Sequence, residues 1–157
     1  MQKLSHEEYF RTLNRKRMGA SVIFFDSEGR LLVVKPNYKD GWLMPGGSVD
    51  ADESPMTAGI RETKEEIGLD VENLKLVCVH YLKAVDEIVS ETVQYVFFGG
   101  VLKEEQILKI VLQSEELDEY RFVTVEESAG MLRPNLKYRL PFCLDAIKNN
   151  TVAYLES

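Results

Sequence analysis

Apolar positions along this chain follow two periods, one of about two residues that is typical of strands and one of about 3.6 residues that is typical of helices. Runs rich in β-branched and aromatic residues, bounded by polar or glycine-rich turns, predict strands. These strands span residues 19–25, 31–35, 74–85, 93–102 and 121–125. Because they outnumber the helices and do not strictly alternate with them, the pattern predicts an α+β fold with a mixed β-sheet.

The clearest helix signal lies between Ser54 and Gly68. Ser54 is a favourable N-cap, Pro55 fits the first helical position, where its missing N–H costs nothing, and Gly68 favours a C-terminal stop. At about 100° per residue, one side of this helix is apolar and the other side is acidic. The apolar arc holds Met56, Ile60, Thr63 and Ile67, and the acidic arc holds Glu62, Glu65 and Glu66.

Two shorter helices are predicted near the ends of the chain. Ser5 and Glu8, three residues apart, have the spacing of a capping box and predict a basic N-terminal helix within residues 1–17. Pro141 is predicted to start a last helix that runs through Ile147, because proline is well tolerated in the first turn of a helix.

The length and composition of the chain limit the classes of protein to which it belongs. With 157 residues and no repeat, low-complexity tract or linker, residues 1–157 are predicted to form a single domain. A content of 45% hydrophobic and 29% charged residues excludes disordered and fibrous proteins. The net charge of −7 argues against binding to a nucleic-acid polymer or an anionic membrane. An acidic protein that acts on phosphates therefore needs a divalent cation between its own carboxylates and the substrate.

The sequence also predicts a cytoplasmic protein with no membrane segment. Cys78 and Cys143 show neither zinc-site spacing nor a disulfide framework, so both are interpreted as reduced core thiols. The first residues lack the apolar stretch of a secretory signal, and every apolar run is far shorter than the ~20 residues of a membrane span. His80, in an apolar strand, is interpreted as a core residue rather than a catalytic base.

The acidic arc of the central helix is a candidate metal site. Glu62, Glu65 and Glu66 fall within one helical turn, and three like charges at this spacing repel one another unless a cation lies between them. Carboxylate oxygens at this density suit Mg²⁺ or Mn²⁺. The triplet alone, however, is more typical of a solvated helix face than of a metal site.

The residues around the triplet favour a metal site over a solvated helix face. The segment from Gly47 to Leu69 resembles the Nudix box: a glycine, five residues, Glu53, seven residues, Arg61-Glu62, an aliphatic position, any residue, two glutamates, any residue, a glycine and an aliphatic residue. Only Thr63 departs, where the family usually has an aliphatic side chain. Its methyl is expected to pack in the core while its hydroxyl bonds to a carbonyl one turn back, at a modest cost in stability.

The resemblance implies a Nudix fold, with a mixed β-sheet sandwiched between α-helices, and Mg²⁺-dependent hydrolysis of a nucleoside diphosphate linked to another moiety. Carried onto this chain, it implies a metal site formed by Glu62, Glu65, Glu66 and the backbone carbonyl of Gly46. Arg61 and Glu53 would pair to brace the loop against the helix, the alternative being an exposed salt bridge of at most ~1 kcal/mol. The candidate catalytic residues are Arg61, Glu53, Glu62 and Glu65, together with Glu116, whereas Glu66 and Gly46 are candidates for the metal site alone.

Other parts of the site are less fully specified. The family often takes one more acid, the general base, from a loop beyond the box, and the acidic run at residues 114–119 offers Glu116 first and Glu119 second. Trp42 and Tyr38 are candidates for stacking on a nucleobase, and Lys35 for contacting phosphates. Each of the three has a structural alternative as a core or surface residue.

Two functional interpretations remain open on this basis. The leading one is a metal-dependent pyrophosphohydrolase with Mg²⁺, or alternatively Mn²⁺, acting on a small nucleotide-type substrate of unidentified structure. The alternative is a catalytically silent Nudix-fold module that binds or senses nucleotides. Association into a homodimer through the N-terminal helix is a further expectation.

Overall fold

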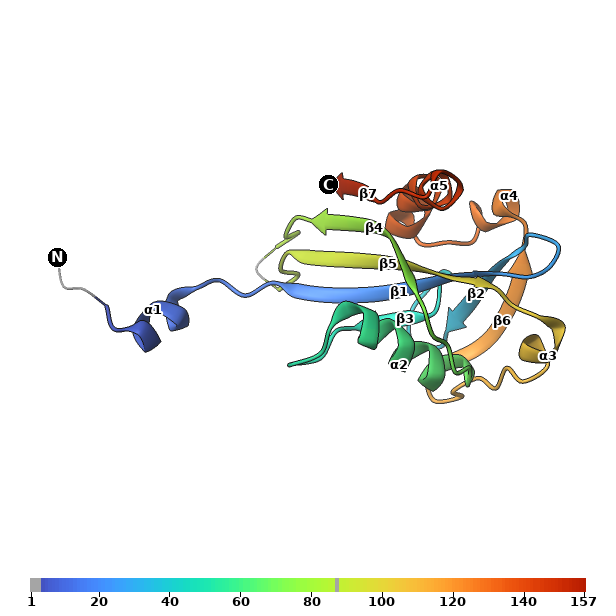
Figure 1. Ribbon diagram of the computed structural model, residues 1–157, viewed down its shortest axis with the longest axis horizontal. Helices are drawn as coiled ribbons and strands as arrows, with labels where there is room; N and C mark the ends of the chain where they lie inside the picture. Colours follow the sequence, from blue (N-terminus) through green and yellow to red (C-terminus); the bar gives the residue numbers. More distant parts are fainter. Residues whose placement is uncertain (1–3, 87) are drawn as a thin grey trace.

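The computed structural model describes residues 4–86 and 88–157 (Figure 1). Its strands are β1 (Arg17–Phe25), β2 (Leu31–Pro36), β3 (Gly46–Ser48), β4 (Lys75–Leu82), β5 (Thr92–Val101), β6 (Leu117–Val123) and β7 (Ala153–Glu156). Its helices are α1 (His6–Thr12), α2 (Pro55–Ile67), α3 (Glu104–Ile107), α4 (Val125–Ser128) and α5 (Pro134–Asn149). The strands form one sheet in the order β6-β2-β1-β5-β4-β7, with β3 paired to β1. The β1–β5 and β4–β7 pairs are parallel and the others are antiparallel, so the sheet is mixed as predicted.

The two long helices cover opposite faces of this sheet, α2 on one side and α5 with α4 on the other (Figure 1). Side chains of β1 alternate between the two faces, as a strand requires. Val22 and Phe24 belong to the apolar cluster on the α2 side, and Ile23 belongs to the cluster on the α5 side. Cys78 and Cys143 are both buried and free in the second cluster, as predicted. The expected α+β fold, a mixed sheet between helices, is confirmed.

Local signals in α2 behave as the sequence predicts. The Ser54 hydroxyl accepts a hydrogen bond from the Thr57 N–H at 3.1 Å, and Gly68 ends the helix with a φ of 75°. The Thr63 hydroxyl is buried and donates to the Gly59 carbonyl at 2.8 Å, one turn back. A single methyl at Gly59 would lie 3.3 Å from a side chain of β1, which explains a glycine inside a helix. The departure at Thr63 is therefore accommodated locally.

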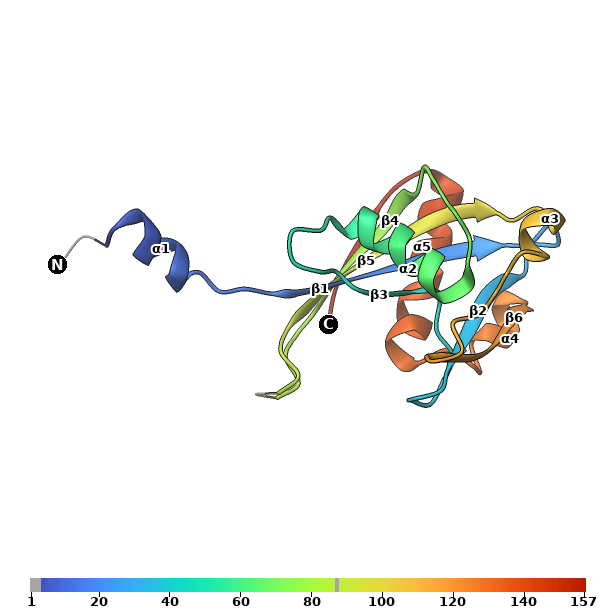
Figure 2. The same cartoon turned by 90° about the horizontal axis from the view of Figure 1, so that it is seen from below.

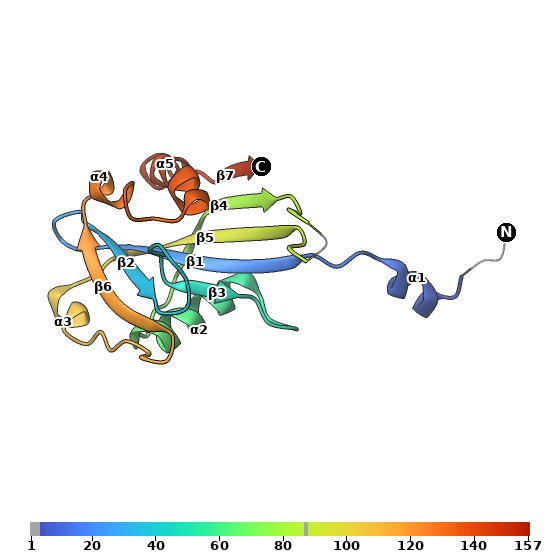
Figure 3. The same cartoon turned by 180° about the vertical axis from the view of Figure 1, so that it is seen from behind.

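The N-terminal helix projects away from the body of the molecule (Figures 1, 2 and 3). Its capping box between Ser5 and Glu8 is formed, but none of its residues is buried. The prediction of a helix over residues 1–17 is wrong in extent, because α1 ends at Thr12 and β1 already begins at Arg17. Pairing of β1 with β5 begins at this point and fixes the backbone as a strand. A short helix with no packed face has nothing to extend it.

Two further boundaries differ from the prediction. The last helix starts at Pro134 rather than Pro141, and Pro141 lies inside it. Burial of Leu140 and Cys143 against the sheet outweighs the cost of about 3 kcal/mol for an interior proline. Strand β6 begins at Leu117 and takes in part of the acidic run that was expected to be a loop. Among the described residues, no helix is long and apolar enough to span a membrane.

Candidate active site

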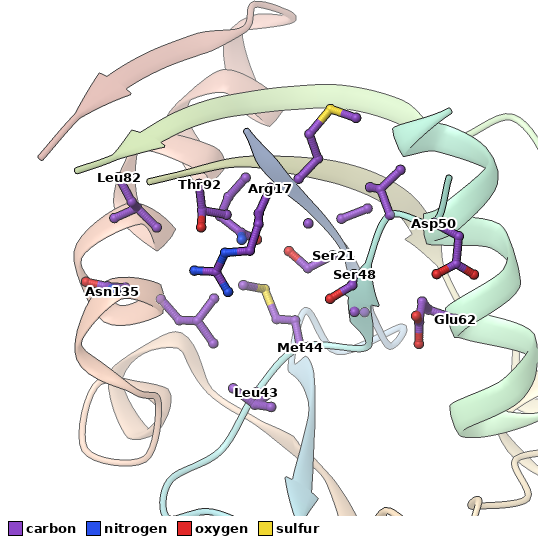
Figure 4. Close-up of a pocket in the computed structure, with 18 of the residues that line it drawn as sticks. Arg17, Ser21, Leu43, Met44, Ser48, Asp50, Glu62, Leu82, Thr92 and Asn135 are labelled. Carbon is purple, nitrogen blue, oxygen red and sulfur yellow. The ribbon is translucent and has the colours of Figure 1, made fainter. Parts of the chain in front are cut away.

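A cavity of about 1310 Å³ lies between α2 and α5, at one end of the sheet (Figure 4). Figure 4 shows Glu62 and Asp50 on one side of it and Asn135 of α5 on the opposite side. Ser21 and Ser48 lie between them, on β1 and β3. The cavity therefore reaches from α2 to α5 past the strands β1 and β3, which form its floor.

Two glycines allow the loop before α2 to approach this floor closely. Gly46 has a φ of 150° and pairs with Ser21, and a Cβ at this position would collide with the backbone carbonyl of Ala20. At Gly47 a Cβ would collide with the carboxylate of Glu62 instead. A side chain at Gly46 would thus clash with the backbone of β1, and a side chain at Gly47 would displace the carboxylate of Glu62.

Glu66 is the most deeply buried of the site carboxylates, with 4% of its surface exposed. Its Oε2 accepts a hydrogen bond from the Gly46 N–H at 2.8 Å. Burial raises the pKa of Glu66 to about 7, and the neighbouring charges of Glu62 and Glu116 act in the same direction. Burial also raises the pKa of Glu62. The site therefore concentrates negative charge where water cannot fully solvate it.

Arg61 holds this acidic cluster together. Its guanidinium makes two bonds to Glu53, from Nε at 2.9 Å and from Nη2 at 3.0 Å. Its Nη1 donates to Glu62 at 2.9 Å and to Glu65 at 3.1 Å, and its Nη2 donates to the carbonyl of Ser48 at 3.0 Å. Bonds from Arg61 lower the pKa of Glu53. The Arg61–Glu53 pair thus ties the loop to α2 and differs from an isolated exposed salt bridge.

The residues predicted to bind a metal all line the cavity, at Gly46, Glu62, Glu65 and Glu66. Within the described part of the chain, no three His, Cys, Asp or Glu side chains are gathered as a ready coordination set. Oxygens of Glu62 and Glu65 are bonded to Arg61, and one oxygen of Glu66 is bonded to a backbone N–H. The chemistry of the donors nevertheless fits a hard divalent cation, because clustered carboxylates exceed the cationic groups between them.

Glu116 also lines the cavity, whereas Glu119 is absent from the described lining and pairs with Arg121 at 2.5 Å. The position of Glu116 depends on a long-range contact, in which its carbonyl accepts from the Asn37 N–H at 2.9 Å. Its charge contributes to raising the pKa values of Glu62 and Glu66. Of the two candidates for general base, Glu116 is therefore the one placed beside the carboxylate helix.

The three predicted substrate contacts separate into two groups. Among the described residues that line the cavity, Tyr38 is present and Trp42 and Lys35 are not. Trp42 packs against the α5-side cluster and lies under the Arg121 guanidinium, 5.0 Å from the ring centre. Lys35 is an exposed residue of β2 paired with Glu119. The structure thus places Trp42 and Lys35 in structural or surface positions.

The far end of the cavity contains polar residues that the sequence analysis did not identify. They include Ser21 and Arg17 on β1 and Asn135 and Arg139 on α5. Arg139 stands at helical spacing among Leu136, Leu140 and Cys143 and therefore on a buried face, but this signal can be read only when the helix is known to begin at Pro134.

His80 is a neighbour of this end and is fully buried. Its Nδ1 accepts from Arg139 Nε at 3.2 Å, and its Nε2 lies 2.9 Å from the hydroxyl of Ser157. Burial, with the charge of Arg139 acting in the same direction, lowers the pKa of His80 to about 4. The interpretation of His80 as a satisfied core residue is confirmed.

Comparison with known sequences identifies the class of protein that this fold and site define. The sequence profile of the NUDIX domain matches residues 15–142. The chain belongs to the Nudix hydrolase family.

Matches to individual relatives are shorter. An RNA pyrophosphohydrolase of Hydrogenovibrio crunogenus is 37% identical over 60 residues, which cover 38% of this chain and 36% of that protein. An m7GpppN-mRNA hydrolase of Saccharomyces cerevisiae is 37% identical over 51 residues, or 32% of this chain and 5% of that protein. The matched segments thus span well under two thirds of these curated relatives.

Solved structures share the fold over most of the chain. The MutT protein of Methanosarcina mazei Go1 has a TM-score of 0.68 and 22% identity, covering 88% of this chain and 99% of that one. The dihydroneopterin triphosphate pyrophosphohydrolase of E. coli has a TM-score of 0.65 and 20% identity, covering 86% and 99%. At these identities the likeness establishes the fold alone.

Proposed function

We propose that this protein hydrolyses a pyrophosphate bond in a nucleoside diphosphate linked to another moiety, with Mg²⁺ or alternatively Mn²⁺ as cofactor. The observation that carries the proposal is the convergence of Glu62, Glu65, Glu66 and Glu116 on one end of a single cavity. An acidic cluster of this kind, in which Glu66 is buried and Glu62 is half-buried, is unfavourable for a purely structural role, because its carboxylates repel one another. Family membership supports the same assignment.

The residues have distinct proposed roles. The carboxylates of Glu62, Glu65 and Glu66, with the carbonyl of Gly46, would hold the metal. When bound, the metal supplies charge neutralisation at the diphosphate and lowers the pKa of a coordinated water. Glu116 is proposed to accept the proton of the attacking water.

Other residues of the cavity hold and position these groups. Arg61 keeps the carboxylates aligned through its bonds to Glu53 and to the carbonyl of Ser48. Tyr38, which lines the cavity, is proposed to stack on the nucleobase. A volume of about 1310 Å³ leaves space for a nucleotide and a second group, since it exceeds the roughly 300–1,000 Å³ of ordinary ligand sites.

A substrate screen tests this function directly. The panel contains nucleoside and deoxynucleoside triphosphates, nucleotide sugars, ADP-ribose, dinucleoside polyphosphates and coenzyme A, with a 5′-triphosphorylated RNA because two relatives are named as acting on RNA. Product masses identify the bond that is cleaved. Mg²⁺-dependent cleavage of at least one compound, lost with EDTA and in Glu65→Gln but kept in Lys64→Gln, is the expected result.

The same screen distinguishes the alternative of a silent binding module. Binding of a nucleotide with no release of phosphate or monophosphate at alkaline pH, with and without Mg²⁺, would support that alternative and contradict hydrolysis. The homodimer is a separate prediction, which light scattering of the full chain tests. Cytoplasmic location remains a prediction from the sequence.

A further inference from the structure

Arg139 is a buried cation whose hydrogen-bonding capacity is mostly unused. Only 3% of its surface is exposed. Its Nε donates to a neutral acceptor, His80 Nδ1, at 3.2 Å, and within the described residues no carboxylate pairs with it. A guanidinium carries five N–H donors, so the two terminal amino groups are left without a described partner. These terminal nitrogens are not among the described side-chain atoms that are fully buried without a partner, so they remain accessible to an acceptor from outside the protein.

The unpartnered side of Arg139 belongs to the cavity wall. Arg139 lines the cavity together with Asn135, which lies one turn earlier on the same face of α5. Across the floor, Ser21 is 8% exposed, and its hydroxyl is buried without a hydrogen-bond partner in the described structure. Figure 4 shows Ser21 and Asn135 on either side of the Arg17 guanidinium. The cavity that Arg139 lines is thus also bordered by a buried polar atom without a partner, Ser21 Oγ.

The lining of the cavity carries charges of both signs, and its two ends differ in their balance. The acidic residues of the lining gather at the α2 end, where Glu62 and Asp50 lie (Figure 4). Arg17 of β1 and Arg139 of α5 lie toward the opposite end, and the Arg17 guanidinium is held by Ser90 through bonds of 2.9 and 3.0 Å. A ligand that fills the whole cavity would thus meet the carboxylates at one end, with Arg61, Lys39 and Arg133 beside them, and the Arg17 and Arg139 guanidinium groups at the other.

We propose that Arg139 determines specificity by binding a second anionic group, a phosphate or a carboxylate, on the moiety linked to the nucleoside diphosphate. This inference rests on the proposed function and deepens it. A guanidinium presents paired donors that match the oxygens of either anion, and such charge-assisted bonds are stronger than neutral ones. The hydroxyl of Ser21 supplies an additional donor on the floor of the cavity.

The competing explanation is that Arg139 only positions His80 and the last strand. Under that explanation, replacing Arg139 would change folding stability but would not change the ratio between a substrate that carries the extra anion and one that lacks it. The selectivity ratio is therefore the decisive readout.

The experiment uses two matched pairs of compounds. ADP-ribose 1″-phosphate and ADP-ribose differ by a phosphate on the linked ribose, and UDP-glucuronate and UDP-glucose differ by a carboxylate on the linked sugar. We compare kcat/KM and, in the presence of EDTA, Kd by calorimetry, for the wild-type protein and Arg139→Gln. The matched control is Lys137→Gln, which removes the same charge from an exposed position of α5 outside the described cavity lining.

The wild-type protein is expected to prefer the more anionic member of at least one pair by about ten- to a hundredfold. Arg139→Gln should bring that ratio close to one, and Lys137→Gln should keep it. The pair that shows the preference identifies the anion as phosphate or carboxylate. A ratio near one in both pairs for the wild-type protein, or an unchanged ratio in Arg139→Gln, overturns the inference.

Two additional measurements keep the test decisive if no compound is hydrolysed or if Arg139→Gln does not fold. If no compound is hydrolysed, the proposed function fails, while the ratio of dissociation constants in EDTA still decides the role of Arg139. If Arg139→Gln does not fold, Arg139→Lys retains the charge but not the paired donors. A reduced preference in Arg139→Lys supports the inference, and an undiminished one contradicts it.

Discussion

Each end of the cavity contains an arginine, and the two arginines differ in the number and charge of the groups that accept their hydrogen bonds. Arg61 donates to three glutamates and one backbone carbonyl and remains partly exposed. Arg139 is almost fully buried and donates to one neutral histidine. The first arrangement is complete within the protein and stabilises an acidic cluster. In the second arrangement the terminal N–H groups of Arg139 have no described acceptor within the protein, as is expected of a group that binds a ligand.

The largest expected effect concerns the acidic end. Glu66→Gln removes a carboxylate from the proposed metal site and should lower Mg²⁺-dependent hydrolysis by about a hundredfold or more. The amide is neutral and is less costly to bury than a charged carboxylate, so at alkaline pH, where Glu66 is ionised, the free energy of unfolding should not fall. Steady-state kinetics and denaturant unfolding measure the two quantities.

Lys64→Gln is the matched control for this variant, since Lys64 is an exposed residue of the same helix that pairs with Asp70. Near-normal hydrolysis by Glu66→Gln would contradict the assignment of the acidic end.

At the acidic end, substitutions of the two neighbouring glycines should affect different properties, folding stability at Gly46 and hydrolysis at Gly47. Gly46→Ala places a methyl against the backbone of Ala20 and should lower the free energy of unfolding by about 3 kcal/mol. Gly47→Ala meets the far end of the Glu62 side chain, which can move, so stability should change little while hydrolysis falls about tenfold. Chemical denaturation and kcat/KM for both variants test this. Equal losses of stability in the two would refute the distinction.

The two ends should respond to pH with opposite signs. Glu66 has a pKa of about 7 in the fold against 4.5 as its ordinary value, so the folded state binds more protons and stability is gained as pH falls from 7 to 4.5. His80 has a pKa of about 4 against 6.5, so the unfolded state binds more protons and stability is lost as pH falls from 6.5 to 4.

Variants reveal these opposing contributions. Relative to the wild-type protein, Glu66→Gln should lose about 2 kcal/mol of unfolding free energy between pH 6.5 and 4.5, and His80→Gln should gain a similar amount between pH 6.5 and 4. Urea unfolding in EDTA across this range measures both differences. Parallel pH profiles for the two variants would show that the ends do not differ in this way.

The smallest expected effect is at Thr63. Thr63→Val restores the aliphatic residue usual in the Nudix box but removes the bond to the Gly59 carbonyl. The two contributions oppose each other, so the free energy of unfolding should change by less than about 1 kcal/mol. Hydrolysis should be unchanged, because Thr63 faces the core. Thermal unfolding and kcat/KM check the prediction, which a tenfold loss of activity would contradict.

The sequence predicts the acidic end far better than the basic end. The helix α2, its caps and its carboxylates are encoded within one contiguous motif, and their spacing determines which side chains share a face. The approach of Glu116 depends instead on pairing of β6 with β2, in which Leu117 lies opposite Pro36. The sequence supplied the acidic run but not the register that selects one residue from it.

The basic end is assembled from distant segments, which explains why it was not predicted. Arg139 could be identified as a charged residue on an apolar helix face only if α5 were known to begin at Pro134 rather than Pro141. Ser21 has no distinguishing pattern, since its burial without a partner depends on how β3 packs beside it. Trp42 and Lys35 were named from residue type alone, and residue type does not specify which side of a strand or loop faces the cavity.

The position of the Arg17 and Arg139 guanidinium groups, at the end of the cavity away from α2, has a consequence for how a ligand enters. The protein carries a net charge of −7, so its overall field repels anions, and the guanidinium end offers a local region of opposite sign. An elongated polyanion would be captured there first and would advance toward α2 in a fixed orientation. Added salt would then slow capture more than chemistry, because screening acts on the approach and not on bonds already formed.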